Sequence, residues 1–208
     1  MNFEIKNGNN FHISLNETKM EQDVILLHIH ADAKGDPEKL QFAVRWEVPD
    51  IGANTTWSAG NHKDKGIVSN WGKFQPSCAV SLAPIYAAVS YDDKNCQTIA
   101  CSDGKNKLEM RIGAIEENAR LDCSVKFNID YATASYDADL RIDFRNMPFY
   151  EVIDDVRKWW ENYDGYTPVE VQEEAYLQVY STWYSFHQNI DVDAIVDVRC
   201  LKSWDARL

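Results

Sequence analysis

The stretch that decides the fold class reads Leu40-Gln-Phe-Ala-Val-Arg-Trp-Glu-Val48. Large apolar residues stand at every second position, so in an extended strand they share one face and the residues between them share the other. Residues 121–129 repeat this alternation. Strands with one apolar face are typical of antiparallel sheets that cover a common core. We therefore expect a mainly β protein.

Six further segments before residue 146 have the composition of strands. They are Phe11 to Leu15, Val24 to His30, Ala79 to Tyr91 with a break at Pro84, Gln97 to Ser102, Leu108 to Ile112 and Leu140 to Phe144. Turns rich in Gly, Asn and Asp separate most of them. About ten strands without an intervening helix predict a large antiparallel β-sandwich, a supersandwich, over residues 1–146.

Between Pro49 and Pro76 the alternation stops, in a segment that contains Trp57 and Trp71. Irregular insertions of this length are uncommon and are often functional or disordered. In one interpretation both tryptophans pack back on the sheet, since Trp is mostly buried in folded proteins. In the other, one of them offers a flat apolar face to a sugar ring.

A helix is predicted after Pro148, because apolar residues recur at three- and four-residue spacing from Phe149 to Tyr163 until Gly165 ends the pattern. The Trp159-Trp160 pair could form a sugar platform, but at this spacing it is expected to pack against a neighbouring element. Thr167 to Glu174 reads as a polar linker. Residues 147–175 are thus a connecting helix and linker.

Composition restricts the partners. The 208 residues carry a net charge of −12, which repels nucleic acid and anionic membranes, and neither is expected as a partner. The N-terminus, Met1 to Gly8, shows no signal-peptide pattern and no apolar run approaches a membrane span, so a cytoplasmic protein is expected. The five cysteines have no metal-binding spacing and are expected to be reduced.

Two groups of chemically active side chains need an interpretation. His28 and His30 stand two apart in a predicted strand and share a face, which a metal ion could use; no third ligand is spaced nearby, so we favour two histidines on the solvent side. Glu116 and Glu117 are adjacent and are expected in a solvated turn rather than as an acid/base pair. No metal and no cofactor are expected.

The segment Tyr176 to Ile190 is rich in β-branched and aromatic residues and is predicted to form a buried strand that leads into a loop and a helix start. Within it, the run Val179-Tyr-Ser-Thr-Trp-Tyr-Ser-Phe-His-Gln188 resembles the first barrel strand of melibiase-type α-galactosidases, glycoside hydrolase family 36. The resemblance implies a β-sandwich, a connecting helix and then a (β/α)8 barrel. Residues 176–208 would then form the first βα unit of an incomplete (β/α)8 barrel.

The resemblance also implies a site. The Trp of this strand lines the sugar subsite in the family, and Trp183 matches it, with Tyr184 and His187 as further substrate-binding candidates. The alternative is that Trp183 and His187 fill the packing surface of the strand. The implied partner is a galactose-containing oligosaccharide.

Both catalytic aspartates of the family come from later barrel strands, so the resemblance implies no catalytic residue in this chain and no activity of the chain alone. An apolar surface at Val179, Trp183 and Phe186 without barrel partners would favour a homo-oligomer. The alternative function is a carbohydrate-binding or oligomerisation β-sandwich module without enzymatic activity.

The C-terminal sequence departs from the family after Val196. There the family continues with a run like Cys-Ala-Leu-Ala-Lys-Glu-Leu-Gly-Cys-Glu-Ala, and codons for Leu201 to Leu208 can encode its second part in a shifted frame. We therefore expect residues from about Asp197 onward to be read out of frame, the alternative being an ordinary terminus whose match arises from codon freedom.

Overall fold

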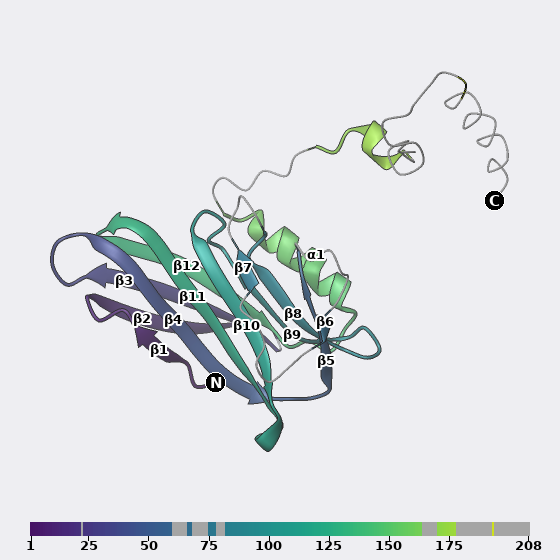
Figure 1. The fold of residues 1–208 in the computed structure, drawn as a ribbon, viewed down its shortest axis with the longest axis horizontal. Coiled ribbons are helices and arrows are strands. Elements are labelled where there is room, and N and C mark those ends of the chain that lie inside the picture. Colours follow the sequence, from purple (N-terminus) through teal and green to yellow (C-terminus); the bar gives the residue numbers. More distant parts are fainter. Residues whose placement is uncertain are drawn as a thin grey trace. The chain divides into compact units, whose positions relative to one another are not determined.

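The computed structural model describes residues 1–21, 23–59, 66–67, 75–77, 82–163, 170–177 and 193. The chain divides into two compact units, Met1–Tyr166 and Thr167–Leu208. In its described part, the first unit consists of two antiparallel β-sheets and the helix α1 (Figure 1). The prediction of a mainly β protein is confirmed.

The smaller sheet has five strands among the described residues, in the order β1-β4-β11-β10-β7. Their bounds are Glu4–Asn7 (β1), Glu38–Pro49 (β4), Arg120–Thr133 (β11), Lys107–Ile115 (β10) and Gln75–Ser77 (β7). In the pairing of β4 with β11, Phe42 lies opposite Phe127 and Trp46 opposite Cys123. The two runs with the clearest alternation are therefore neighbours, and their apolar faces form one surface.

The larger sheet has seven strands in the described part of the chain, in the order β2-β3-β12-β9-β8-β5-β6. Their bounds are Phe11–Glu21 (β2), Val24–Ala33 (β3), Ser135–Asp143 (β12), Asn95–Cys101 (β9), Ile85–Ser90 (β8), Ala53–Ser58 (β5) and Gly66–Ile67 (β6). Strand β2 ends this sheet and pairs with β3. Its residues Ile13 and Leu15 pack against the core between the sheets.

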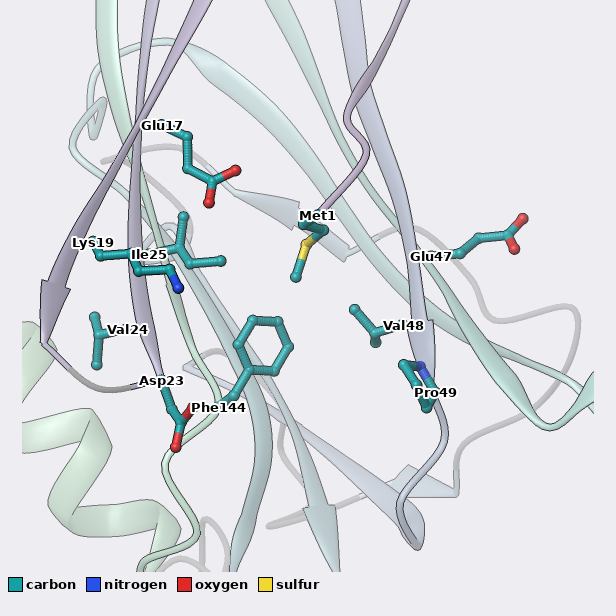
Figure 2. Close-up of a pocket in the computed structure, with 10 residues that line it drawn as sticks. All are labelled: Met1, Glu17, Lys19, Asp23, Val24, Ile25, Glu47, Val48, Pro49 and Phe144. Atoms are coloured by element: carbon teal, nitrogen blue, oxygen red, sulfur yellow. The ribbon is translucent and has the colours of Figure 1, made fainter.

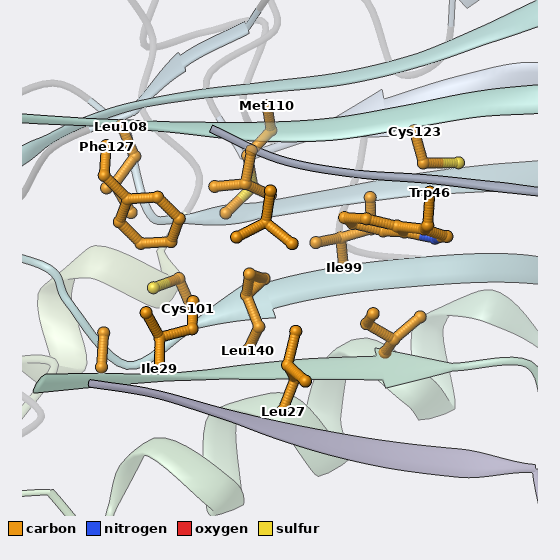
Figure 3. Close-up of a cluster of buried hydrophobic side chains, with 14 of the residues drawn as sticks. Leu27, Ile29, Trp46, Ile99, Cys101, Leu108, Met110, Cys123, Phe127 and Leu140 are labelled. Atoms are coloured by element: carbon orange, nitrogen blue, oxygen red, sulfur yellow. The ribbon is translucent and has the colours of Figure 1, made fainter. Parts of the chain in front are cut away.

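The two sheets face each other across one apolar core. Figure 3 shows Trp46 and Phe127 of the five-stranded sheet opposite Leu27 and Leu140 of the seven-stranded sheet, and all four side chains are buried. Phe127 stacks on Phe42 with ring centroids 4.6 Å apart and ring planes 4° from parallel. The arrangement is sandwich-like, as expected when each sheet has one apolar face.

Helix α1, Phe149–Trp160, covers part of the outer face of the seven-stranded sheet (Figure 1). Val156 and Trp159 pack there against Ile85 and Ala100. The indole N–H of Trp160 donates a hydrogen bond of 2.8 Å to the carbonyl oxygen of Cys101. The packing interpretation of the Trp159-Trp160 pair is thus confirmed.

A buried ion pair network lies between α1 and the sheet. The Asp143 carboxylate is fully buried and accepts hydrogen bonds from the Arg145 side chain, the closest at 2.7 Å, while Arg141 Nη2 lies 2.8 Å away. Arg145 also reaches Asp155 of the helix, at 2.9 Å. Burial lowers the pKa of Arg141, and its Nη1 atom has no hydrogen-bond partner among the described residues. This network ties the middle of α1 to the end of β12.

Strand β5 lies inside the segment Pro49 to Pro76, where an interruption of the alternation was expected. Its β-branched and aromatic residues pair with β8. Trp57 of β5 is half-buried and lies 6.3 Å, between ring centroids, from Phe149 of α1. For Trp57 the packing interpretation is therefore confirmed, whereas Trp71 lies outside the described residues.

The hairpin between β10 and β11 contains Glu116 and Glu117 in the 3-10 helix Glu116–Asn118. Both residues are exposed, as predicted. Ala119 follows with φ of 50°, a left-handed conformation that closes the turn.

The second unit differs from expectation at its start. A strand was expected from Tyr176, but Tyr176 ends the 3-10 helix Glu173–Tyr176 and is exposed together with Leu177. The run that carries the resemblance, Val179 to Gln188, lies outside the described residues. No helix in the described part of the chain is long and apolar enough to span a membrane.

Candidate functional site

Two histidines and three aspartates lie in a row on the outer face of the seven-stranded sheet. We call this group the histidine–aspartate ladder: His28, His30 and Asp32 of β3 with Asp137 and Asp139 of β12. The sequence places them there because Leu27, Ile29 and Ala31 take the core face of β3, which turns the alternating polar residues outward. The register sets His28 opposite Asp139 and His30 opposite Asp137.

Hydrogen bonds connect the ladder. His28 Nδ1 lies 2.7 Å from Asp139 Oδ1, and His30 Nδ1 lies 2.7 Å from Asp137 Oδ1. The second ring nitrogen of His30, Nε2, lies 2.9 Å from Asp32 Oδ2. Because carboxylates accept and a ring N–H donates, His30 can satisfy both aspartates only as an imidazolium. The solvent-side interpretation of the two histidines is confirmed, and each has a carboxylate partner.

The ladder reaches the end of α1 through Tyr163. The phenol O–H of Tyr163 donates to Asp139 Oδ2 at 2.6 Å, and the ring packs edge-on against Trp159 at 5.0 Å. Burial is the main cause that raises the pKa of Tyr163, so the phenol stays protonated and remains a donor. Asp139 therefore links His28 with the segment that follows the helix.

The hydrogen bonds that His30 donates to Asp137 and Asp32 raise the pKa of His30 above its ordinary value of 6.5. We predict that Asp137→Asn lowers this pKa, because a neutral amide no longer favours the imidazolium. The stabilisation that His30 provides is complete below the unfolded pKa of about 6.5 and is lost as the pH rises through the higher folded value. NMR titration of the ring Cε1–H measures the pKa directly.

The control for this titration is Asp130→Asn, which changes an exposed aspartate of β11 in the other sheet. It should leave the His30 pKa unchanged. A native His30 pKa at or below 6.5 would contradict the arrangement.

The outer face of the five-stranded sheet carries a second group of charged side chains. Asp122 of β11 is nearly buried and lies between Arg45, whose Nε is 2.6 Å from Asp122 Oδ1, and Arg111. Beside it, Arg120 Nε donates to Glu47 at 3.1 Å. These carboxylates are engaged in ion pairs across strands, a structural arrangement that satisfies the charges on this face.

A cavity of about 350 Å³ opens at one end of the two-sheet unit (Figure 2). Phe144 and Val48 form part of its apolar lining, and Glu17, Lys19 and Asp23 lie at its edge. Cavities of this volume are at the lower limit for small-molecule sites, which generally measure about 300–1,000 Å³.

The residues predicted from the resemblance, Trp183, Tyr184 and His187, lie outside the described residues. The buried cysteines Cys96, Cys101 and Cys123 are free thiols, and burial raises the pKa of Cys96 to about 11, so this thiol is unreactive near neutral pH. Sequence reasoning missed Asp137 and Asp139, because the predicted strand began only at Leu140 whereas β12 begins at Ser135.

No protein-family model matches the chain, and no curated protein matches it either.

Proposed function

We propose that this chain is an N-terminal part of an α-galactosidase-like glycoside hydrolase and is non-catalytic by itself. The observation that carries the proposal is the order of the chain. A two-sheet unit with one packed helix is followed by a separate unit that begins at Thr167 and contains the run from Val179 to Gln188. In the resembled family a sandwich and a connecting helix likewise come before the barrel, and this supports the proposal.

The charges in the first unit support a non-catalytic role. Retaining glycosidases need two carboxyl groups about 5 Å apart, one of them a protonated acid. The nearly buried Asp122 and the buried Asp143 are each engaged in ion pairs with arginines. These groups suit structural roles.

In the complete enzyme, Trp183 would stack on the apolar face of a galactose ring, and Tyr184 and His187 would bind hydroxyl groups. The barrel strand that carries them would supply the subsite, while the catalytic aspartates would come from later strands. The substrate class is a galactose-containing oligosaccharide.

We predict that the purified chain does not hydrolyse an aryl α-galactoside, because the resemblance places both the nucleophile and the acid on barrel strands after the first. The measurement is release of the aryl alcohol, with an active α-galactosidase of the family as positive control. Turnover that disappears when a single carboxylate of this chain is replaced would contradict the proposal.

The second candidate is a carbohydrate-binding or self-associating module. The half-exposed hydrogen-bonding groups of the histidine–aspartate ladder beside Tyr163 favour it, because sugar sites combine such groups with aromatic rings. Titration with galactose and raffinose distinguishes the two functions, since a binding module retains affinity as an isolated chain. Light scattering at increasing concentration tests the expected homo-oligomer.

A further inference from the structure

The cavity at the open end of the two-sheet unit continues the core. Its apolar side chains come from the start of β3, the end of β4 and the residue after β12: Val24, Ile25, Val48, Pro49 and Phe144. Ile25 and Val48 belong to the core cluster, and Phe144 packs against it. Figure 2 shows the Phe144 ring with Ile25 to one side and Val48 to the other. A molecule in this cavity therefore lies against the apolar end of the core.

Strand β2 borders the same cavity with polar groups. Alternate residues of a strand share a face, and on β2 the residues Ile13 and Leu15 pack against the core. The next two residues on that face are Glu17 and Lys19, which are exposed and line the cavity. Apolar side chains thus stop on β2 where they continue on β3 and β4. The cavity has an apolar floor and a polar mouth.

The mouth carries charges of both signs. Glu17 and Asp23 present carboxylates and Lys19 presents an ammonium group, and all three side chains are exposed at the edge of the cavity. An ionic ligand is attracted by one sign and repelled by the other, so it gains little there. A hydroxyl group can donate a hydrogen bond to a carboxylate and accept one from an ammonium group. The mouth therefore suits a neutral polar group.

The volume and the floor restrict the rest of the ligand. An apolar cavity of about 150 Å³ binds benzene, so the 350 Å³ of this cavity is sufficient for two fused rings. A sugar fits the floor poorly, because its hydroxyl groups would lose their hydrogen bonds to water against Ile25, Val48 and Phe144. A hydrocarbon gains free energy in proportion to the apolar area that it buries. The floor therefore favours a hydrocarbon body.

We propose that this cavity binds one small neutral amphiphile, a two-ring hydrocarbon body with one hydroxyl group. The rings lie against Ile25, Val48 and Phe144, and the hydroxyl group lies at the mouth beside Glu17 and Lys19. All residues that line the cavity belong to the first unit. The ligand class differs from the galactose-containing oligosaccharide of the proposed function, and the site does not depend on the glycosidase assignment.

The test is an NMR titration of the full chain with 2-naphthol, followed on the methyl signals of Ile25 and Val48. We expect saturable shifts with a dissociation constant of about 1 mM or lower, as for ligands of this size. Phenol should bind about tenfold more weakly, because it lacks the second ring and buries less apolar area. The anion 2-naphthoate should also bind more weakly than 2-naphthol, because a charge is costly beside an apolar floor. Galactose should shift neither methyl signal.

A substitution that reduces the cavity gives a second measurement. Val48→Phe adds a ring to the lining and should abolish the Ile25 shifts caused by 2-naphthol. The control Val171→Phe makes the same change at a position that is 54% exposed and should bind as the unchanged chain does. Thermal unfolding of each variant establishes that it is folded. For the unchanged chain, shifts centred on other residues, the absence of saturation, or larger Ile25 and Val48 shifts with galactose than with 2-naphthol overturn the proposal.

Discussion

Replacing Asp143 with alanine should lower the free energy of unfolding by about 3–5 kcal/mol, the range found when one partner of a buried ion pair is removed. Asp143 is fully buried, and both Arg145 and Arg141 lie within 2.8 Å of its Oδ2 atom. The substitution leaves the nearly buried Arg141 without the carboxylate that lies 2.8 Å from its Nη2 atom. It also loosens the connection from β12 to α1 that passes through Arg145 and Asp155.

Urea unfolding followed by circular dichroism measures this effect. The matched control is Asp130→Ala, because the Asp130 side chain is 85% exposed and pairs with the exposed Lys39. Surface ion pairs contribute about 0–1 kcal/mol, so the control should be nearly neutral. Equal losses in the two variants would show that burial of the Asp143 network does not stabilise the fold.

Replacing Phe127 with alanine should cost a similar amount, about 3–5 kcal/mol, through loss of buried area and creation of a cavity. Phe127 is fully buried in the core between the sheets. It stacks on Phe42, with 4.6 Å between centroids, and meets Tyr136 edge-on at 6.0 Å. The variant therefore removes contacts to both sheets.

Tyr131→Ala is the control for Phe127→Ala, because it removes an aromatic ring from the same strand at a position that is 56% exposed. Surface substitutions generally change stability by about 0.5 kcal/mol or less. The same unfolding experiment applies. A Phe127→Ala loss below about 1 kcal/mol would mean that the core refills around the missing ring.

The sequence predicts the core strands well and the edges of the sheets poorly. Residues 40–48 and 121–129 alternate strictly, because β4 and β11 each bury one face. β1 could not be predicted, since all its residues are exposed and it forms by pairing with β4. β5 could not be predicted either, because its segment shows no alternation and its conformation depends on pairing with β8.

The ladder could be predicted only in part. The alternation in β3 correctly places His28 and His30 on the solvent side, because Leu27 and Ile29 require the core. Their partners are separated from them by 107 and 111 positions along the chain, so the pairing depends on the register of β3 with β12. A periodic pattern identifies the face of a strand but not the neighbour or the register, which tertiary packing determines.

The end strand β2 has a consequence for how copies of this protein meet. An unpaired strand edge is a template onto which another chain can add, and proteins discourage this with charged residues that point inward. Glu17 and Lys19 of β2 lie on the same side as Ile13 and Leu15 and line the cavity at the open end (Figure 2). A strand added beside them would bury two charges, which is costly. Among the described strands, the edge of β2 thus disfavours the addition of a further strand.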